Sequence, residues 1–262
     1  MPKTPYVPPI PPRIRAIDLE DVRAALRAGV DDFKAEPKFG IVIGLIYALA
    51  GIAMMAGIGG AAPIWAIIPL MLGFPLVGPF VAVAFYEISR ARAEGRAPTW
   101  GDVLRLMLAQ RNRELVWMAM VVLFVFWIWI YQVRLLLALW LGFAAFSDPA
   151  SFASVAFTTP AGIGFLINGT IVGGLLALVL FSLTVTAIPL LLDQDRDIVT
   201  AMIASVRSVL ASPRPMLSWA VFVAICLFIA MLPAFLGLAI ALPILGHATW
   251  HLYTKTVERS GG

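Results

Sequence analysis

The chain has 262 residues, of which 61% are hydrophobic and only 13% are charged. A soluble domain averages about 45–50% apolar and roughly 25% charged residues. No soluble fold of this length has an interior large enough to hide so much apolar surface, so the composition excludes a soluble protein and predicts lipid as the main solvent. The lone cysteine, Cys226, can form no internal disulfide, and no paired-cysteine motif for metal or redox chemistry is present.

Six apolar runs are predicted to cross the bilayer, which takes about 20 predominantly apolar residues. The third and fourth runs are too long for one upright crossing, so each must tilt, kink or continue as helix beyond the lipid. The fifth and sixth meet around Pro233 with almost no room for a loop, which leaves five spans as an alternative to six. The predicted spans are residues 39–58, 63–86, 115–146, 160–192, 216–232 and 235–253.

The basic residues predict which loops lie in the cytoplasm. Of the 19 Lys and Arg residues, all except Arg134 fall in residues 1–38, 87–114 and 193–215 or after residue 254. The positive-inside rule therefore places both termini and the two larger loops in the cytoplasm. The net charge of +4 arises from these dispersed topology signals rather than from one basic patch, which argues against a nucleic-acid partner.

Three cytoplasmic segments show a common pattern, in which an aspartate at or near the start of an amphipathic stretch is followed by a span. These aspartates are Asp21, Asp102 and Asp197, and Asp18 is the predicted N-cap of the first stretch. One helical face of each outer stretch is apolar, with members Leu19, Val22, Leu26 and Phe33 in the first and Ile198, Met202, Val206 and Val209 in the third. We therefore predict an all-α membrane bundle of six transmembrane helices in three hairpins, each preceded by a cytoplasmic amphipathic helix.

The predicted organisation is a disordered N-terminal tail over residues 1–17, one polytopic membrane domain over residues 18–254 and a C-terminal tail over residues 255–262. Residues 1–12 are rich in proline, and the first long apolar run begins only after Lys38. We therefore expect membrane targeting by the spans themselves rather than by a cleavable signal peptide.

The two histidines, His247 and His251, are four residues apart and so share one face of the last predicted helix. This spacing lets two imidazoles reach one metal ion in zinc-binding helices, but a third ligand would have to come from elsewhere, for instance from Glu87 or Asp193. The alternative is that both histidines lie at the headgroup level beside Trp250, as an interfacial anchor.

Arg134 lies in a run that is otherwise apolar and aromatic, and an arginine at the bilayer centre usually marks a functional site. If the helix enters the membrane at Leu115, Arg134 lies about 28 Å further along, close enough to the outer face for its side chain to reach the headgroups. If the span is centred nearer Arg134, the guanidinium needs interior partners such as Gln132, Asn168 or Thr170. We favour the first reading.

Prolines interrupt the second predicted span at Pro69, Pro75 and Pro79, and each removes a backbone donor. Broken helices line the binding sites of many transporters, whereas a kink packed against its neighbours is the simpler reading. Small residues at Gly40 and Gly44, and at Gly169 and Gly173, would permit close helix contacts within the bundle or between subunits. No catalytic motif or cofactor-binding motif is present, and no cofactor is predicted.

Four stretches together resemble a bacterial family of predicted integral membrane proteins called domain of unknown function 2189. They are GPF at residues 78–80, FYEISR at 85–90, PLLLD at 189–193 and GHATWHLY at 246–253. The resemblance, which runs from about Asp18 onward, implies a polytopic bacterial inner-membrane protein without an established activity. Some family members are labelled cytochrome c oxidase subunit I, but two histidines on one helix face cannot ligate the haem and copper centres of an oxidase core.

Three functional hypotheses follow, in order of preference. The first is a non-catalytic accessory or assembly protein that binds another membrane complex, or assembles with its own copies, through aromatic and small-residue surfaces such as residues 124–131. The second is a transporter or binder of a small apolar or lipid-like ligand, at a membrane-depth cavity that reaches Pro75 or Arg134. The third is a membrane enzyme that uses a metal ion at His247 and His251.

Overall fold

The computed structural model describes residues 12–58, 74, 78–109, 113–142 and 149–258. These residues are almost entirely α-helical, and among them only one isolated β-bridge occurs, between Ile14 and Val257. The helices are α1 (Leu19–Ala35), α2 (Pro37–Ile58), α4 (Gly78–Ala93), α5 (Trp100–Ala109), α6 (Arg113–Trp140), α7 (Pro149–Thr158), α8 (Pro160–Thr184), α9 (Ala187–Asp193), α10 (Ile198–Ala211), α11 (Pro213–Met231) and α12 (Leu238–Thr256).

Four stretches of helix are long and apolar enough to cross a membrane. They are Pro37–Ala56, Glu114–Trp140, Pro160–Asp193 and Pro213–Met231, and they coincide with the first, third, fourth and fifth predicted spans. Most of the second predicted span lies outside the described residues, and its end, residues 78–86, forms the start of α4. The sixth predicted span corresponds to α12, whose composition is less apolar than that of the four.

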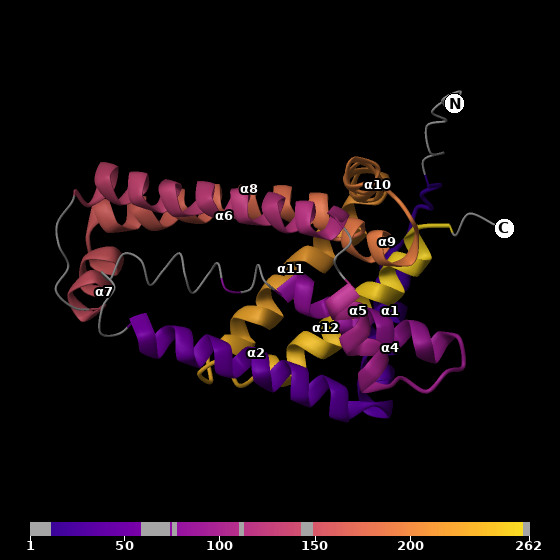
Figure 1. Ribbon diagram of the computed structural model, residues 1–262. Helices are drawn as coiled ribbons and strands as arrows, with labels where there is room; N and C mark the ends of the chain where they lie inside the picture. Colours follow the sequence, from indigo (N-terminus) through magenta and orange to yellow (C-terminus); the bar gives the residue numbers. More distant parts are fainter. Residues whose placement is uncertain (1–11, 59–73, 75–77, 110–112, 143–148, 259–262) are drawn as a thin grey trace, which may run out of the picture.

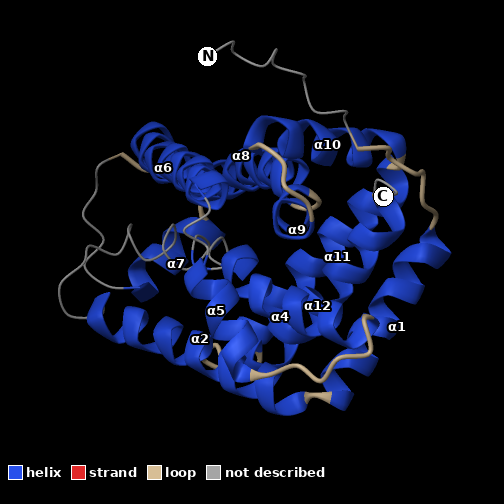
Figure 2. Cartoon of the chain, turned by 45° about the vertical axis from the view of Figure 1, so that its right-hand side comes forward, coloured by secondary structure: helices blue, strands red, loops and turns tan. Residues whose placement is uncertain are grey.

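The helices form two groups that meet at one end of the molecule. In Figure 1, α6 and α8 run side by side as a long pair, with α7 at the far end from the chain termini. The second group surrounds α12, which packs against α1, α2, α4 and α11. Figure 2 shows the same grouping from another side, with α9 and α10 beside the inner end of α8.

The core lies around α12, where small residues allow close helix contacts. A Cβ atom added at Gly44 of α2 would lie 2.7 Å from the Cα atom of Ala239, so the two backbones approach too closely for a larger side chain. A Cβ atom at Gly40 would lie 3.0 Å from Pro243 Cβ. The predicted close helix contact at Gly40 and Gly44 is therefore confirmed within the bundle.

The fourth predicted span is broken, and a kink was one of the three outcomes that its length allowed. Helix α8 ends at Thr184 and α9 starts at Ala187, because Pro189 has no backbone N–H to donate to the carbonyl four residues earlier. The backbone N–H of Thr186 donates instead to Ser205 Oγ on α10, over 3.1 Å. The break therefore costs no buried hydrogen bond at Thr186.

The turn at Pro233 separates two helices, so α11 and α12 are not one continuous span. Ala234 and Phe235 adopt positive φ angles of 48° and 65°, which reverse the chain within a few residues. Successive backbone hydrogen bonds, such as the one from Phe235 N to Met231 O, hold the turn together.

All three predicted amphipathic segments are helical. Asp18 caps α1 and forms a reciprocal capping box with Asp21, while Asp197 caps α10 by accepting from Thr200 N. The first free N–H of α10, at Ile198, donates to Glu114 Oε2 of α6 over 2.9 Å. In α5, the cap is Thr99, whose hydroxyl accepts from Asp102 N.

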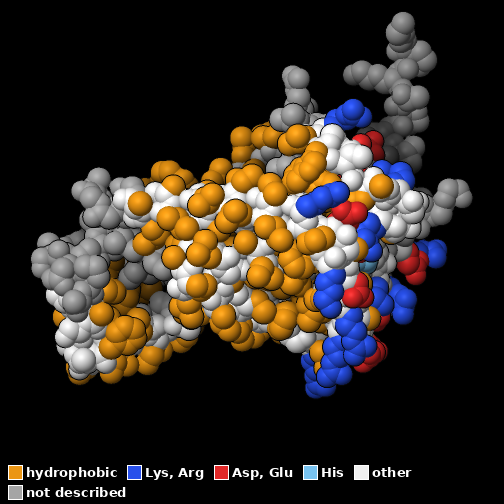
Figure 3. All heavy atoms as spheres, turned by 90° about the horizontal axis from the view of Figure 1, so that it is seen from below, with side chains coloured by type: hydrophobic (Ala, Val, Ile, Leu, Met, Phe, Trp, Pro, Cys, Tyr) orange, Lys and Arg blue, Asp and Glu red, His pale blue; other side chains and the backbone are white. Residues whose placement is uncertain are grey.

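Charged side chains gather at one end of the molecule. Figure 3 shows them as a band at the end that carries the chain termini, with a surface dominated by hydrophobic side chains over the rest of that face. Among the described side chains, Arg134 is the one charged group that lies on the stretch of α6 and α8 away from that band. Such segregation is expected for a protein whose apolar body lies in lipid and whose charged end lies in water.

Candidate functional site

A buried polar network joins α1, α4 and α12 at the charged end. The carboxylate of Asp32, which is only 6% exposed, accepts hydrogen bonds on both oxygens. Its Oδ2 atom accepts from Ser89 Oγ at 2.6 Å and from His251 Nε2 at 2.7 Å, and its Oδ1 atom accepts from Arg92 Nε at 2.8 Å. Ser89 Oγ also lies 2.8 Å from His247 Nδ1. The five side chains therefore form one connected network.

Close packing of α1 on α12 brings Asp32 to the histidines. A Cβ atom added at Gly29 would lie 2.6 Å from the backbone N atom of Ala248, so only glycine allows this approach. Asp32 lies one helical turn beyond Gly29, and Ala248 directly follows His247. The same contact that requires a glycine on α1 therefore also places the carboxylate against the histidine face of α12.

Donors and acceptors in the network define the protonation of His247. The single Ser89 hydroxyl proton is donated to Asp32, so Ser89 Oγ must accept from His247, which carries its proton on Nδ1. In this tautomer, His247 Nε2 is an acceptor. It has no hydrogen-bond partner in the part of the chain that the structure describes, although His247 is fully buried.

Asp32 is held in its charged form. Burial by itself raises the pKa of the Asp32 carboxyl, but hydrogen bonds from His251 and Ser89 outweigh this, and the pKa lies below its ordinary value of 3.8. Arg92 supplies a compensating positive charge. We call this network the ionic clasp, because it joins α1 to α4 and α12. Removal of the carboxylate would leave the groups that bond to it, on Ser89, Arg92 and His251, without that partner.

The burial of the network limits what it can do chemically. Ser89 is hydrogen-bonded to a histidine, as a nucleophilic serine is, but it is only 1% exposed and its proton is donated to Asp32 rather than to a general base on that histidine. Among the described residues, no three His, Cys, Asp or Glu side chains are arranged to hold a metal ion. The geometry fits a structural role, in which the network holds α1 against α4 and α12.

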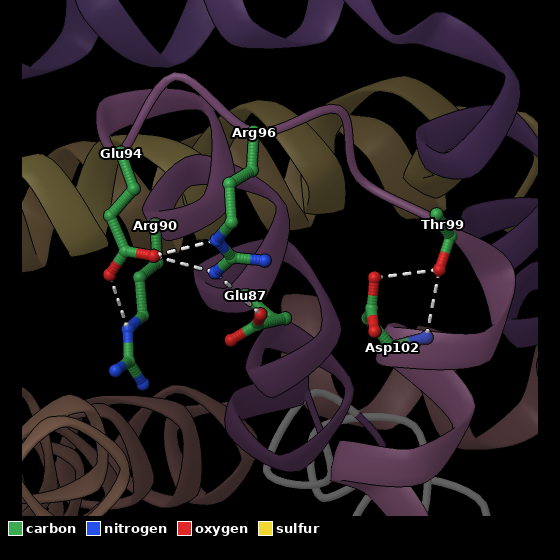
Figure 4. A network of polar contacts seen from close by, with 6 residues as sticks. All are labelled: Glu87, Arg90, Glu94, Arg96, Thr99 and Asp102. Atoms are coloured by element: carbon green, nitrogen blue, oxygen red, sulfur yellow. Dashed lines mark hydrogen bonds and ion pairs between the residues drawn. The ribbon is translucent and has the colours of Figure 1, made fainter.

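A second ionic cluster covers the loop between α4 and α5. Arg96 pairs with Glu94 at 2.6 Å and with Glu87 at 3.5 Å, and Arg90 pairs with Glu94 at 3.1 Å (Figure 4). Glu87 and Arg90 also line a small hollow whose other walls are Tyr86, Leu106, Leu192 and Trp250. Glu87 thus belongs to this cluster, apart from the histidines.

The remaining candidates are dispersed. Asp193 accepts a hydrogen bond from the Tyr253 hydroxyl at 2.9 Å, which ties α9 to α12. Arg134 is exposed on the outer side of α6, six residues before its end, and Gln132 nearby is half-buried. Pro79 is half-buried at the start of α4, and Pro75 lies outside the described residues. The structure therefore brings His247 and His251 into one network but leaves the other candidates separate.

Sequence reasoning missed three members of the network, Asp32, Ser89 and Arg92. The sequence contains a signal for Asp32, because Ala25, Gly29 and Asp32 recur at helical spacing on the buried face of α1. An aspartate in line with small residues on an inward face needs a buried partner. Ser89 and Arg92 carry no comparable signal in the sequence.

Comparison with known proteins gives one match. The model of a family described as predicted integral membrane protein (DUF2189) matches residues 67–193, just under half of the chain. Over these residues, the chain is similar to that family. No curated protein and no solved structure matches it significantly.

The DUF2189 segment covers only part of the buried network. It contains Ser89 and Arg92, together with Glu87 and Asp193, whereas Asp32 and both histidines lie on helices outside it. The clasp therefore connects the family segment to the first and last helices of the chain. The family description supports an integral membrane protein and attaches no activity to any of these residues.

Proposed function

We propose that this protein is a non-catalytic accessory protein that binds another membrane protein through the outer face of α6. The observation that carries the proposal is a row of large side chains that α6 exposes while its opposite side packs on α8. Trp127 and Tyr131 are each 58% exposed, and Phe124 is 66% exposed. The inner side of α6 contributes Val133, Leu136 and Leu137 to a small buried cluster with Phe165 of α8.

The chemistry of this face favours a protein partner over lipid alone. Trp127 lies near the middle of α6, about 21 Å from its start, where an indole N–H meets no headgroup. Its ring contacts that of Tyr131, with centroids 5.7 Å apart. Aromatic residues that combine a large apolar area with a polar group are enriched where proteins bind each other. The exposed Arg134 continues the same face.

The burial and hydrogen bonding of the polar network support a non-catalytic role. Its serine and one histidine are buried, and the carboxylate is used by three donors. A transporter with a site beside Arg134 is less well supported, because Arg134 lies on the outer side of α6 rather than inside the bundle.

The proposal includes the topology of a six-span protein of the bacterial inner membrane. In this arrangement α12 is the sixth span, residues 63–86 form the second, and both termini lie in the cytoplasm. Support comes from the one-sided charge distribution and from α12 being a separate helix of 19 residues. Reporter fusions should place Arg92 and Ser151 on opposite sides of the membrane, and a common side for both would disprove this topology.

Site-specific photocrosslinking in native membranes tests the docking face. A photoreactive amino acid at Trp127 should give a discrete crosslinked protein band, whereas the same substitution at Ile225 of α11, which is 53% exposed, should give none. Ile225 is the matched control because it lies on an equally exposed apolar helix without neighbouring polar groups. The same adducts at both positions, or none at either, would contradict the proposal.

A further inference from the structure

Helix α10 has its amphipathic pattern reversed relative to a helix that faces water. The side that packs into the protein consists of small and polar residues, namely Ala201, Ala204, Ser205 and Ser208, with Val209 at its edge. The opposite side exposes Val199 by 56%, Ile203 by 45% and Leu210 by 71%. These three recur at spacings of four and seven residues, so they form one stripe along the helix.

The buried polar side of α10 has identifiable partners. Ser205 accepts from Thr186 N, and Ser208 Oγ lies 2.8 Å from Thr186 Oγ1 at the break between α8 and α9. The serines therefore face inward because the interrupted span needs them there. The predicted apolar face of this stretch, with Met202 and Val206, is only partly buried, and the exposed stripe lies beside it.

The position of α10 indicates what covers the exposed stripe. The helix lies at the charged end of the molecule and crosses the direction of α6 and α8, so that Figure 1 shows it nearly end-on while those helices run across the view. A helix that lies across the spans at the charged boundary, with an apolar outer side, has the geometry of an interfacial helix in the membrane plane. In that position, the exposed stripe contacts the acyl chains of lipids.

Arginines complete the surface. Arg207 is exposed four residues after Ile203 on the same side of α10, and Arg214 is exposed at the start of α11. Within the described residues, neither one forms an ion pair with a carboxylate. The sequence from Ile198 to Val257 contains no Asp or Glu. Asp197 caps the opposite end of α10, so Arg207 and Arg214 place their positive charge toward the end of that helix that has no carboxylate close in sequence.

We propose that α10 and the start of α11 bind an anionic phospholipid. Its acyl chains contact the stripe of Val199, Ile203 and Leu210, and its phosphate contacts Arg207 and Arg214. The inference is independent of the docking face on α6, because the two surfaces lie on different helices and take different partners.

Native mass spectrometry of the purified full-length protein tests this site. The protein is titrated with phosphatidylglycerol and, in parallel, with phosphatidylcholine and with glycerol phosphate. The test variant is the double substitution R207Q/R214Q. The matched control is R23Q/R27Q on α1, which removes the same charge from exposed arginines that lie 3.7 Å and 3.8 Å from Glu20.

We expect R207Q/R214Q to weaken phosphatidylglycerol binding by about fivefold for each charge removed, with little effect of R23Q/R27Q. Phosphatidylcholine binding should change little in either variant. The additional variant I203S/L210S should also weaken phosphatidylglycerol binding. Glycerol phosphate, which lacks acyl chains, should not compete with phosphatidylglycerol for the site. Equal losses in both arginine variants, or full competition by glycerol phosphate, would overturn the proposal.

Discussion

Helix α6 is more apolar than α12 but less buried, so apolar composition and burial do not go together in these two helices. The most apolar window of α6 has a mean hydropathy of 2.1, yet only 22% of it is buried. Helix α12 is not among the four apolar spans, yet eleven of its 19 residues are buried, His247 and Trp250 among them. High hydropathy therefore does not identify the helix at the centre of the bundle, because a helix surrounded by protein can carry histidines, threonines and glycine.

The largest difference in stability should come from replacing one tryptophan on each of the two helices by alanine. Trp250 is 2% exposed and packs against Tyr86 and Tyr253, whereas Trp127 is 58% exposed. We expect Trp250→Ala to lower the free energy of unfolding by about 3–5 kcal/mol, because it leaves a large cavity in the core. Trp127→Ala should change it by about 0.5 kcal/mol or less.

Denaturant unfolding in detergent micelles, followed by circular dichroism, measures both tryptophan variants. Equal losses would mean that burial does not distinguish α12 from α6. A small loss at Trp250 alone would show that α12 is not the centre of the stable core.

A second comparison uses two glycines. A Cβ atom at Gly29 would collide with the backbone of α12 at Ala248, whereas one at Gly174 on α8 would meet no atom within 4 Å. Gly29→Leu should therefore destabilise the protein by about 1–3 kcal/mol or more through overpacking. Gly174→Leu should be close to neutral. Thermal unfolding of the two variants decides the matter, and a neutral Gly29→Leu would show that α1 does not dock closely on α12.

The smallest expected effect is a pH dependence of the unfolding free energy, which arises from Asp32 in the clasp. Because hydrogen bonds hold the pKa of Asp32 below its ordinary value of 3.8, its charge stabilises the folded state above that pH. The contribution is lost as the pH falls through the lower folded-state pKa. The difference in unfolding free energy between the natural protein and Asp32→Asn should therefore be constant near neutral pH and shrink below about pH 4.

A pair of titrations over pH 3 to 8 checks this expectation, with Asp31→Asn as the control on the exposed neighbour. If the stability difference grew on acidification, Asp32 would be protonated in the folded protein and the ionic description of the clasp would be wrong.

The sequence predicted the elements that depend on local composition. Four of the six predicted apolar spans, the cap at Asp18 and the helical conformation of the three amphipathic segments all follow from residues within one segment. The prediction that His247 and His251 share one face of their helix also agrees with the structure, since both contribute to one network.

What the sequence could not supply was the pairing between distant segments. Asp32 meets Ser89 across 57 positions and His251 across 219. Helical periodicity shows which way a side chain faces along its own helix, but not which helix lies opposite. For α10, the buried face differs from the predicted apolar face. The break between α8 and α9 is hydrogen-bonded to serines of α10, so these serines face inward.

The pairing of α1 with α12 constrains the order in which the clasp can form. Arg15 N donates to Thr256 O, Glu258 N donates to Arg13 O, and Lys255 lies 3.0 Å from Asp21. Helix α1 thus has its binding surface on a helix that is synthesised much later. During synthesis Asp32 therefore lacks its histidine partner until His251, 219 positions further along the chain, has been made.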